Sequence, residues 1–230
     1  MKNILRIPII VLNDLVLLLI IYIPGRLGIK MRYIYWRLNL KKCGRNVRVE
    51  TGVMIENPEF ISIGDNVLID KYSIITAGKR TKHSNDIIKE MINNNFRYNE
   101  GELVIGTGVH IGCFNIIQAH AGVYIGDFVT TSAGVKIFSI SNYYSSEENP
   151  ELITYANCMV GEEKPVSYIS SPIVIKEGVW LALNCSVLCG TIGANSFIAS
   201  NSMVVTDLPA NSYSRGNPAV KIKERFTTKK

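Results

Sequence analysis

An aliphatic residue returns at every sixth position over much of the chain. From Pro172 to Val205 these positions keep a period of six, with a one-residue slip near Gly190. They are Ile175, Leu181, Val187, Ile192, Ile198 and Val204. In a helix, residues six apart would not share one face. A flat strand would need apolar and polar residues to alternate over more residues than strands usually have. The pattern therefore predicts a parallel β-solenoid, in which each hexad forms one short strand and a turn.

Three earlier runs follow the same rule. Their aliphatic positions are Ile63, Ile69 and Ile75, then Ile105, Ile111 and Ile117, then Ile125, Thr131 and Ile137. Glycine or aspartate often follows the aliphatic residue. Both residues suit turns that form a compact corner or have a positive φ. The period is thus a property of the whole domain, and we expect a mainly β fold with three strands per coil.

Two polar stretches interrupt the hexads, at residues 79–102 and 139–171. We interpret both as loops that leave the solenoid at a coil corner, and long loops on a rigid scaffold often carry function. The expected organisation is a solenoid over residues 47–217 followed by a basic C-terminal tail, residues 218–230.

Residues 1–46 are predicted to form a helical segment of apolar and basic character. Residues 7–24 are almost wholly apolar but contain Asn13 and Asp14, and they are short for a membrane span. Residues 26–45 alternate arginine and lysine with tyrosine, tryptophan and leucine, which is typical of a helix at a bilayer surface. We expect attachment to the inner face of the cell membrane. A helical pair that caps the solenoid and a true membrane span are the alternatives.

Composition limits the classes of protein. With 230 residues, 47% of them hydrophobic, the chain is long enough to bury one domain core. The net charge is +6, but no nucleic-acid-binding motif accompanies it, so a membrane surface or a polyanionic ligand fits better than DNA or RNA. The five cysteines lack a CxxC pair, which favours a reducing, cytoplasmic compartment.

The hexads, the stretch VWLALN and the ending GNPAVKIKERF together resemble the hexapeptide-repeat acyltransferases. Among these, the chain is most similar to the sugar O-acetyltransferases related to galactoside acetyltransferase, over residues 47–226. The resemblance implies a left-handed parallel β-helix, a homotrimer with active sites between subunits, acetyl-CoA as acyl donor, a hydroxyl or amine acceptor, and no metal.

The resemblance also implies roles for individual residues. Trp180 would lie beside the donor channel, and the backbone N–H of Leu183 would face the developing oxyanion. Pantetheine would run near Ser200 and Asn201, although small polar residues also suit plain solenoid corners.

The coenzyme A phosphates would meet Lys223, with Lys221 and Arg215 close by. Thr206 stands where relatives often have a further lysine, so one phosphate contact is expected to be absent.

The general base is the main departure from the family pattern. The family has a histidine in the loop that here reads FSISNYYSS, and Asn142 occupies the corresponding place. An amide cannot accept a proton usefully, whereas histidine titrates near neutral pH.

His120 is the expected replacement. It lies where Ile117 and Ile125 are eight residues apart instead of six, so two extra residues must bulge from the coil corner. The two coils are neighbours, so His120 and Asn142 are expected to face one cleft. A structural corner histidine is the alternative interpretation of His120.

The other two histidines are weaker candidates. His83 lies in the first polar loop, and His110 lies within a hexad, where a structural role is expected. Their spacing with His120 lacks the close ligand pair of a zinc solenoid of the carbonic-anhydrase kind. Glu147 and Glu148 are interpreted as solvated loop charges, with orientation of a base or binding of the acceptor as the alternative.

These features predict an acetyl-CoA-dependent O-acetyltransferase that acts on a sugar of a cell-surface polysaccharide or of its lipid-linked precursor. One alternative is N-acetylation of a nucleotide-linked amino sugar. Another is a catalytically inactive scaffold in glycan assembly, for which Asn142 is the best argument.

Overall fold

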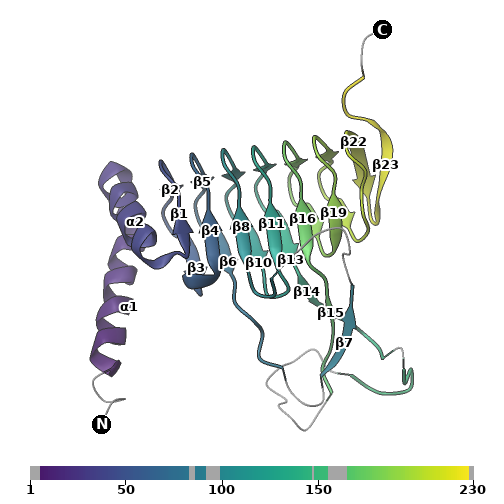
Figure 1. The fold of residues 1–230 in the computed structure, drawn as a ribbon, viewed down its shortest axis with the longest axis horizontal. Coiled ribbons are helices and arrows are strands. Elements are labelled where there is room, and N and C mark those ends of the chain that lie inside the picture. Colours follow the sequence, from purple (N-terminus) through teal and green to yellow (C-terminus); the bar gives the residue numbers. More distant parts are fainter. Residues whose placement is uncertain (1–5, 83–85, 92–98, 147, 155–164, 228–230) are drawn as a thin grey trace.

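The computed structural model describes residues 6–82, 86–91, 99–146, 148–154 and 165–227. Two N-terminal helices precede a row of stacked coils, and a hairpin ends the row (Figure 1). The helices are α1 (Arg6–Tyr22), α2 (Gly25–Asn39) and a short 3-10 helix, η1 (Pro58–Phe60).

The coils build three sheets, because each coil adds one short strand to each of three faces. Neighbouring coil strands pair in parallel, which confirms the predicted mainly β fold, a left-handed parallel β-helix. The first face contains β1 (Lys42–Cys43), β4 (Ile61–Ile63), β8 (Leu103–Ile105), β11 (Val123–Ile125), β16 (Ile173–Ile175) and β19 (Gly190–Ile192). The second contains β2 (Arg48–Val49), β5 (Leu68–Ile69), β9 (His110–Ile111), β12 (Thr130–Thr131), β17 (Trp180–Leu181), β20 (Phe197–Ile198), β22 (Ser212–Gly216) and β23 (Ala219–Glu224). The third contains β3 (Met54–Glu56), β6 (Ile74–Thr76), β10 (Ile116–Gln118), β13 (Lys136–Phe138), β18 (Ser186–Val187) and β21 (Met203–Val204).

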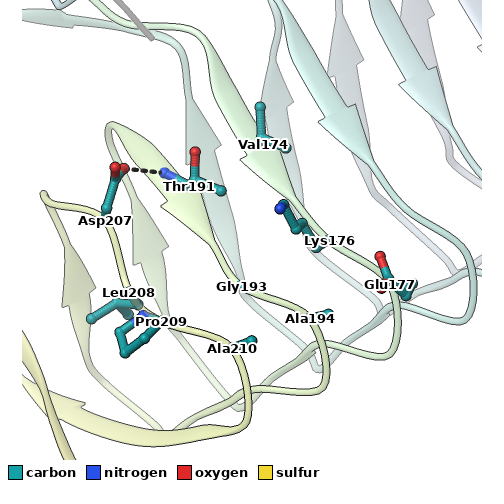
Figure 2. A pocket seen from close by; sticks show the side chains of 10 residues that line it. All are labelled: Val174, Lys176, Glu177, Thr191, Gly193, Ala194, Asp207, Leu208, Pro209 and Ala210. Carbon is teal, nitrogen blue, oxygen red and sulfur yellow. Dashed lines mark hydrogen bonds between the residues drawn. The ribbon is translucent and has the colours of Figure 1, made fainter. Parts of the chain in front are cut away.

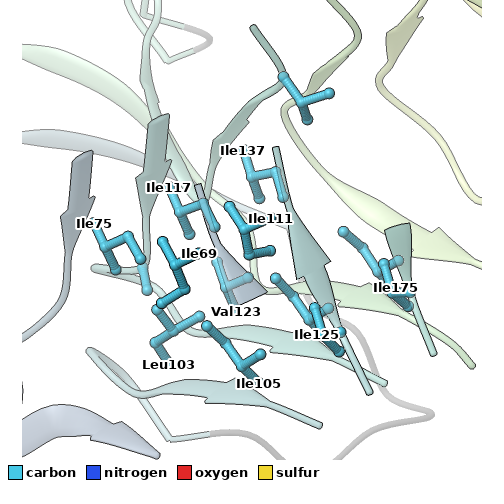
Figure 3. Close-up of a cluster of buried hydrophobic side chains, with 14 of the residues drawn as sticks. Ile69, Ile75, Leu103, Ile105, Ile111, Ile117, Val123, Ile125, Ile137 and Ile175 are labelled. Atoms are coloured by element: carbon cyan, nitrogen blue, oxygen red, sulfur yellow. The ribbon is translucent and has the colours of Figure 1, made fainter. Parts of the chain in front are cut away.

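The hexad aliphatics form the core. Ile63 pairs with Ile105 of the next coil. Ile69 likewise pairs with Ile111, so equal positions of successive coils stack on one another (Figure 3). All four side chains are at most 1% exposed. Burial of one such side chain stabilises the fold by about 1.5–3 kcal/mol, which explains why the period persists through the domain.

Corners of the coils use left-handed backbone. Gly134 has a φ of +74°, and a Cβ at this position would lie 2.2 Å from Oδ1 of Asn184 in the next coil. Asn184 itself has a φ of 57°, which asparagine tolerates better than most residues. Glycine and asparagine therefore allow the coils to turn and stack closely.

The two predicted loops each contribute strands to a fourth sheet. It contains β7 (Ile87–Glu90), β14 (Ile140–Asn142) and β15 (Ser167–Ser170), in the order β14-β15-β7. β15 runs antiparallel to β14 and parallel to β7. Figure 1 shows this sheet extending from the coils on the same side as α1. The hexad period does not reveal these strands, because they pair with one another and not with the coils.

Both ends of the solenoid differ from the expected boundaries. β1 pairs with β4, so the first coil begins before residue 47. At the other end, residues 218–230 include β23, which pairs antiparallel with β22 and covers the edge that β22 would otherwise expose.

Buried Arg32 joins α1 and α2 to the first coil. Its guanidinium donates to the carbonyl oxygens of Val49 (2.7 Å), Ile20 (2.9 Å) and Ile23 (2.8 Å), and the side chain is fully buried. Burial lowers the pKa of Arg32, and nearby Glu50 partly opposes this effect. Within the described residues, neither helix is long and apolar enough to cross a bilayer.

Candidate active site

His120 lies in a tight turn that follows β10. The N–H of Gly122 donates to the carbonyl oxygen of Ala119 at 2.9 Å, and Gly122 has a φ of +102°. This turn holds the extra residues between Ile117 and Ile125, so the predicted bulge is present. A residue in such a turn projects from the regular coil.

One hydrogen bond fixes the orientation of the His120 imidazole. Its Nδ1 lies 2.7 Å from the carbonyl oxygen of Gly78, at the same corner of the preceding coil. A carbonyl oxygen only accepts, so Nδ1 carries the hydrogen and Nε2 of the neutral ring keeps a lone pair. Among the described residues, Nε2 has no hydrogen-bond partner. The ring is therefore in the tautomer that a general base needs.

Ser139 supports the same turn from the next coil. Its hydroxyl accepts the N–H of Ala121 at 2.9 Å and donates to the carbonyl oxygen of Gln118 at 3.0 Å. Ser139 is fully buried, so no water competes for these bonds. The turn that carries His120 is thus held on both sides, by Gly78 and by Ser139.

His120 and Asn142 line one pocket of about 490 Å³, as the sequence predicts. The other lining residues are Arg80, Gln118, Phe138, Ile140, Ser141 and Leu188. Asn142 is exposed and ends β14, where it pairs with Tyr168 of β15. The Asn142 amide can form hydrogen bonds in the pocket but cannot take a proton.

Arg80 gives the pocket a positive charge. Its guanidinium lies over the ring of Tyr168, 4.1 Å from the ring centroid, and Tyr168 is 1% exposed. Burial raises the pKa of Tyr168, so this phenol stays neutral under Arg80. The aromatic platform leaves the guanidinium edge available for an anionic or polar group.

Trp180 lies on the second face and not in this pocket. It is 44% exposed, and its indole N–H donates to Ser132 Oγ at 3.1 Å. Its ring meets Phe197 edge to face at 5.2 Å, and Phe197 stacks on Tyr213 at 5.4 Å. These three aromatic side chains stack in a row along β17, β20 and β22, with Trp180 exposed and Phe197 and Tyr213 partly buried.

Leu183 occupies the corner between the second and third faces. Its side chain is half-exposed, and no acceptor in the described part of the chain takes its N–H. Leu188, five residues on, lines the His120 pocket, whereas Leu183 does not. The corner at Asn184 and strand β18 separate the two leucines. Within one chain, the Leu183 N–H is therefore not part of the His120 pocket.

The other predicted coenzyme residues lie toward the C-terminal end. Ser200 and Asn201 are exposed at a coil corner, and the N–H of Asn201 donates to the carbonyl oxygen of Leu183 at 2.9 Å. Arg215 lies on β22, and Lys221 and Lys223 lie on β23. Lys221 forms an ion pair with Glu224, and the Lys223 ammonium lies 5.3 Å from the Tyr213 ring centroid. The structure brings these cations together on the hairpin, apart from His120.

His110 has a structural partner, as expected. Its Nε2 lies 2.9 Å from Oδ2 of Asp70 in the preceding coil. His83 and Glu147 lie outside the described residues, and Glu148 is exposed. Among the residues that are described, no group of three histidine, cysteine, aspartate or glutamate side chains is placed to hold a metal ion.

A second pocket, of about 580 Å³, lies beside the last coils (Figure 2). Asp207 accepts the N–H of Thr191 there at 2.7 Å, while Lys176 and Glu177 extend from the neighbouring corner. None of the predicted site residues lines it, and its lining lacks a histidine. The His120 pocket is therefore the better candidate for acid–base chemistry.

Sequence reasoning missed three residues of the site: Gly78, Ser139 and Arg80. Gly78 supplies a carbonyl from the preceding coil, 42 residues earlier in the chain, and Arg80 lies in a polar stretch that has several cations. Only Ser139 carried a local signal, because it follows the last strand of a coil where the hexads stop.

The chain is similar to known acyltransferases in sequence. It is 25% identical over 202 residues to dTDP-4-amino-4,6-dideoxy-D-glucose acyltransferase of Escherichia coli, which covers 82% of this chain and 84% of that protein. It is 48% identical over 60 residues to the putative colanic acid biosynthesis acetyltransferase WcaF of Escherichia coli K12. This match covers 26% of this chain and 33% of that protein. No family model matches the chain.

The fold is also found in solved structures. The S84A mutant of AntD, an N-acyltransferase from Bacillus cereus, superposes with a TM-score of 0.65 at 19% identity, covering 85% of this chain and 90% of AntD. That structure contains dTDP-4-amino-4,6-dideoxyglucose and coenzyme A. The hexapeptide-repeat acetyltransferase VCA0836 from Vibrio cholerae superposes with a TM-score of 0.53 at 20% identity, covering 88% of this chain and 84% of that one.

Proposed function

We propose that this chain, which belongs to the hexapeptide-repeat acyltransferases, transfers an acetyl group from acetyl-CoA to a sugar hydroxyl, with His120 as general base. The observation that carries this proposal is the Nδ1–Gly78 hydrogen bond, since it leaves Nε2 of His120 as a proton acceptor inside the pocket. Asn142 in place of a histidine was the main argument for an inactive scaffold. His120 lines the same pocket and supplies a histidine there, which weakens that argument.

The reaction needs no covalent enzyme intermediate. The acceptor oxygen attacks the thioester carbonyl as His120 Nε2 takes its proton, so negative charge develops on the carbonyl oxygen. Collapse of this intermediate breaks the carbon–sulfur bond. The imidazolium then returns the proton to the departing thiolate, which leaves as free coenzyme A.

The oxyanion partner would come from a neighbouring subunit. Leu183 does not line the His120 pocket of its own chain, so a role for both residues in one reaction calls for two copies of the chain. We propose a homotrimer in which the Leu183 N–H of one subunit faces His120 of the next. An inactive His120→Ala protein mixed with an inactive Leu183→Pro protein, which lacks the N–H, should then regain activity when their subunits exchange.

Coenzyme A would lie along the faces that carry the remaining predicted residues. Trp180 and the Asn201 corner would border pantetheine, and Ser200 stands beside them. The hairpin cations Arg215, Lys221 and Lys223 would meet the phosphates, because cationic side chains are the usual phosphate partners. No metal is needed in this scheme.

The acceptor we favour is a sugar of a cell-surface polysaccharide or of its lipid-linked precursor. The similarity to a putative colanic acid acetyltransferase supports this choice. A nucleotide-linked amino sugar is the second candidate, because the Escherichia coli relative that covers 82% of this chain is named for such a substrate. Arg80 suits a lipid-linked precursor and a nucleotide-linked sugar alike, since both carry phosphate.

We further propose that the protein attaches peripherally to the inner face of the cell membrane. Exposed aliphatic side chains on α1 support this placement, for example Leu15, Leu18 and Leu19, which are 54%, 57% and 67% exposed. Attachment would bring the site to a lipid-linked acceptor.

The direct test is thiol release from acetyl-CoA with a panel of bacterial glycan precursors and nucleotide-linked amino sugars. The proposal expects release that depends on acceptor, and a product whose acetyl group is lost under mild alkali, as an O-ester is. A product that is stable to mild alkali would instead indicate N-acetylation of an amine acceptor. Absence of acetyl-CoA binding by calorimetry would contradict acyl transfer altogether.

A further inference from the structure

A basic cleft lies between α2 and the first coil. It measures about 630 Å³ and is lined by Arg26, Ile29, Lys30, Tyr33, Asn46, Val47 and Arg48. Arg26 and Lys30 are exposed, and among the described residues neither forms an ion pair. Arg48 is paired with Glu50 at 2.6 Å. The cleft therefore keeps two cations without a counterion.

The neighbouring face of α2 is apolar and open to solvent. Leu27, Ile34 and Leu38 are 65%, 51% and 80% exposed, and with Met31 they recur at intervals of three and four residues. Such residues share one side of a helix, beside the stripe that carries Arg26 and Lys30. The third side of α2, with Arg32 and Trp36, is buried against the solenoid.

An apolar stripe flanked by cations is the pattern of a helix that lies in a bilayer interface. We propose that this cleft binds the phosphate groups of anionic lipids while the Leu27–Leu38 stripe enters the headgroup region. This inference rests on the membrane attachment proposed above and adds a specific site to it. A second copy that packs α2 against α2 fits less well, because it would bring the same uncompensated cations against Arg26 and Lys30.

The Arg32 contacts give the site a fixed geometry. Arg32 ties α2 to the carbonyl oxygens of α1 and of Val49, so cleft and stripe cannot turn independently of the coils. Arg26 and Lys30 are therefore held over the Asn46–Arg48 wall without being part of the acyl-transfer site.

The test is sedimentation of the full chain with vesicles of phosphatidylcholine alone or with phosphatidylglycerol. Wild type should bind the anionic vesicles, and less so at high salt. Arg26→Gln/Lys30→Gln should weaken this binding about 30-fold, at about 1 kcal/mol per basic residue near the surface. The control Lys71→Gln/Lys136→Gln removes the same charge from exposed coil positions and should bind like wild type.

Other outcomes overturn the proposal in distinguishable ways. If both double variants lose affinity equally, net charge drives binding and the cleft is not a site. If Arg26→Gln/Lys30→Gln binds like wild type, attachment stands without the cleft. If wild type binds neither vesicle, attachment fails too, and if Leu27→Gln/Leu38→Gln changes the oligomeric state, the stripe is an interface between copies. Inorganic phosphate that displaces the vesicles at millimolar concentration would identify free phosphate as the ligand.

Discussion

The substitution Ser139→Ala tests whether the turn that carries His120 must be held in place. The Ser139 hydroxyl makes two hydrogen bonds to this turn, to the Ala121 N–H at 2.9 Å and the Gln118 carbonyl at 3.0 Å. Its loss leaves the N–H of Ala121 unpaired, in a residue that is only 3% exposed. An unpaired buried donor and a lost bond together cost about 2 kcal/mol of unfolding free energy.

The effect on activity should exceed the effect on folding. A base displaced by about 1 Å can slow the reaction about 100-fold. We therefore expect kcat to fall by about 10- to 100-fold under conditions where the variant stays folded, with unchanged affinity for acetyl-CoA. Urea unfolding at one fixed protein concentration gives the stability, and thiol release gives kcat.

Ser73→Ala is the matched control. Ser73 is equally buried, and its hydroxyl donates to the Gly112 carbonyl at 2.9 Å, away from the His120 turn. It should lose about 1 kcal/mol of stability and keep its kcat. If Ser139→Ala loses stability but keeps the wild-type kcat, or if Ser73→Ala slows the enzyme equally, the proposed support of His120 is wrong.

Two further predictions concern stability. The pKa of Glu102 is lowered, mainly because Lys41 donates a hydrogen bond to it at 2.6 Å and also because Asn99 and Tyr124 donate to it. Ionised Glu102 therefore stabilises the folded state above the unfolded pKa of about 4.3. This stabilisation is lost as the pH falls through the lower pKa of the folded state. Urea midpoints should therefore fall with acid in wild type more steeply than in Glu102→Gln, and parallel curves would contradict this. Arg32→Met should lower the free energy of unfolding by about 3 kcal/mol, because the carbonyl oxygens of Ile20, Ile23 and Val49 lose their donor. It should also speed proteolysis after Tyr22. Arg37→Met, at an exposed position of the same helix, should change neither the stability nor the proteolysis rate.

The coils could be predicted from sequence because their cause is periodic and local. The strands bury side chains such as Ile69 and Ile111, and every sixth position again needs a side chain that fits the core. The His120 bulge was visible for the same reason, since an eight-residue gap in a six-residue period must leave the coil. Pairing of β7, β14 and β15 has no such period, so their strands stayed hidden.

The remaining geometry depends on residues that are distant in sequence. Gly78 meets His120 only because consecutive coils place their corners in one column, and no local pattern marks a carbonyl oxygen as a partner. The absence of Leu183 from the His120 pocket likewise depends on how the corners of different coils are arranged. The sequence motif indicated both residues but not their relative placement.

His120 is the residue on which the account of catalysis depends, and His110→Ala is its natural control, because His110 contacts Asp70 and lies outside the pocket. The most direct measurement is acetyl-CoA turnover and acetyl-CoA affinity for wild type, His120→Ala and His110→Ala. We expect His120→Ala to lose about 100- to 10,000-fold in kcat while it binds acetyl-CoA like wild type. His110→Ala should retain turnover. If His120→Ala turns over as fast as an active wild type, His120 is not the base.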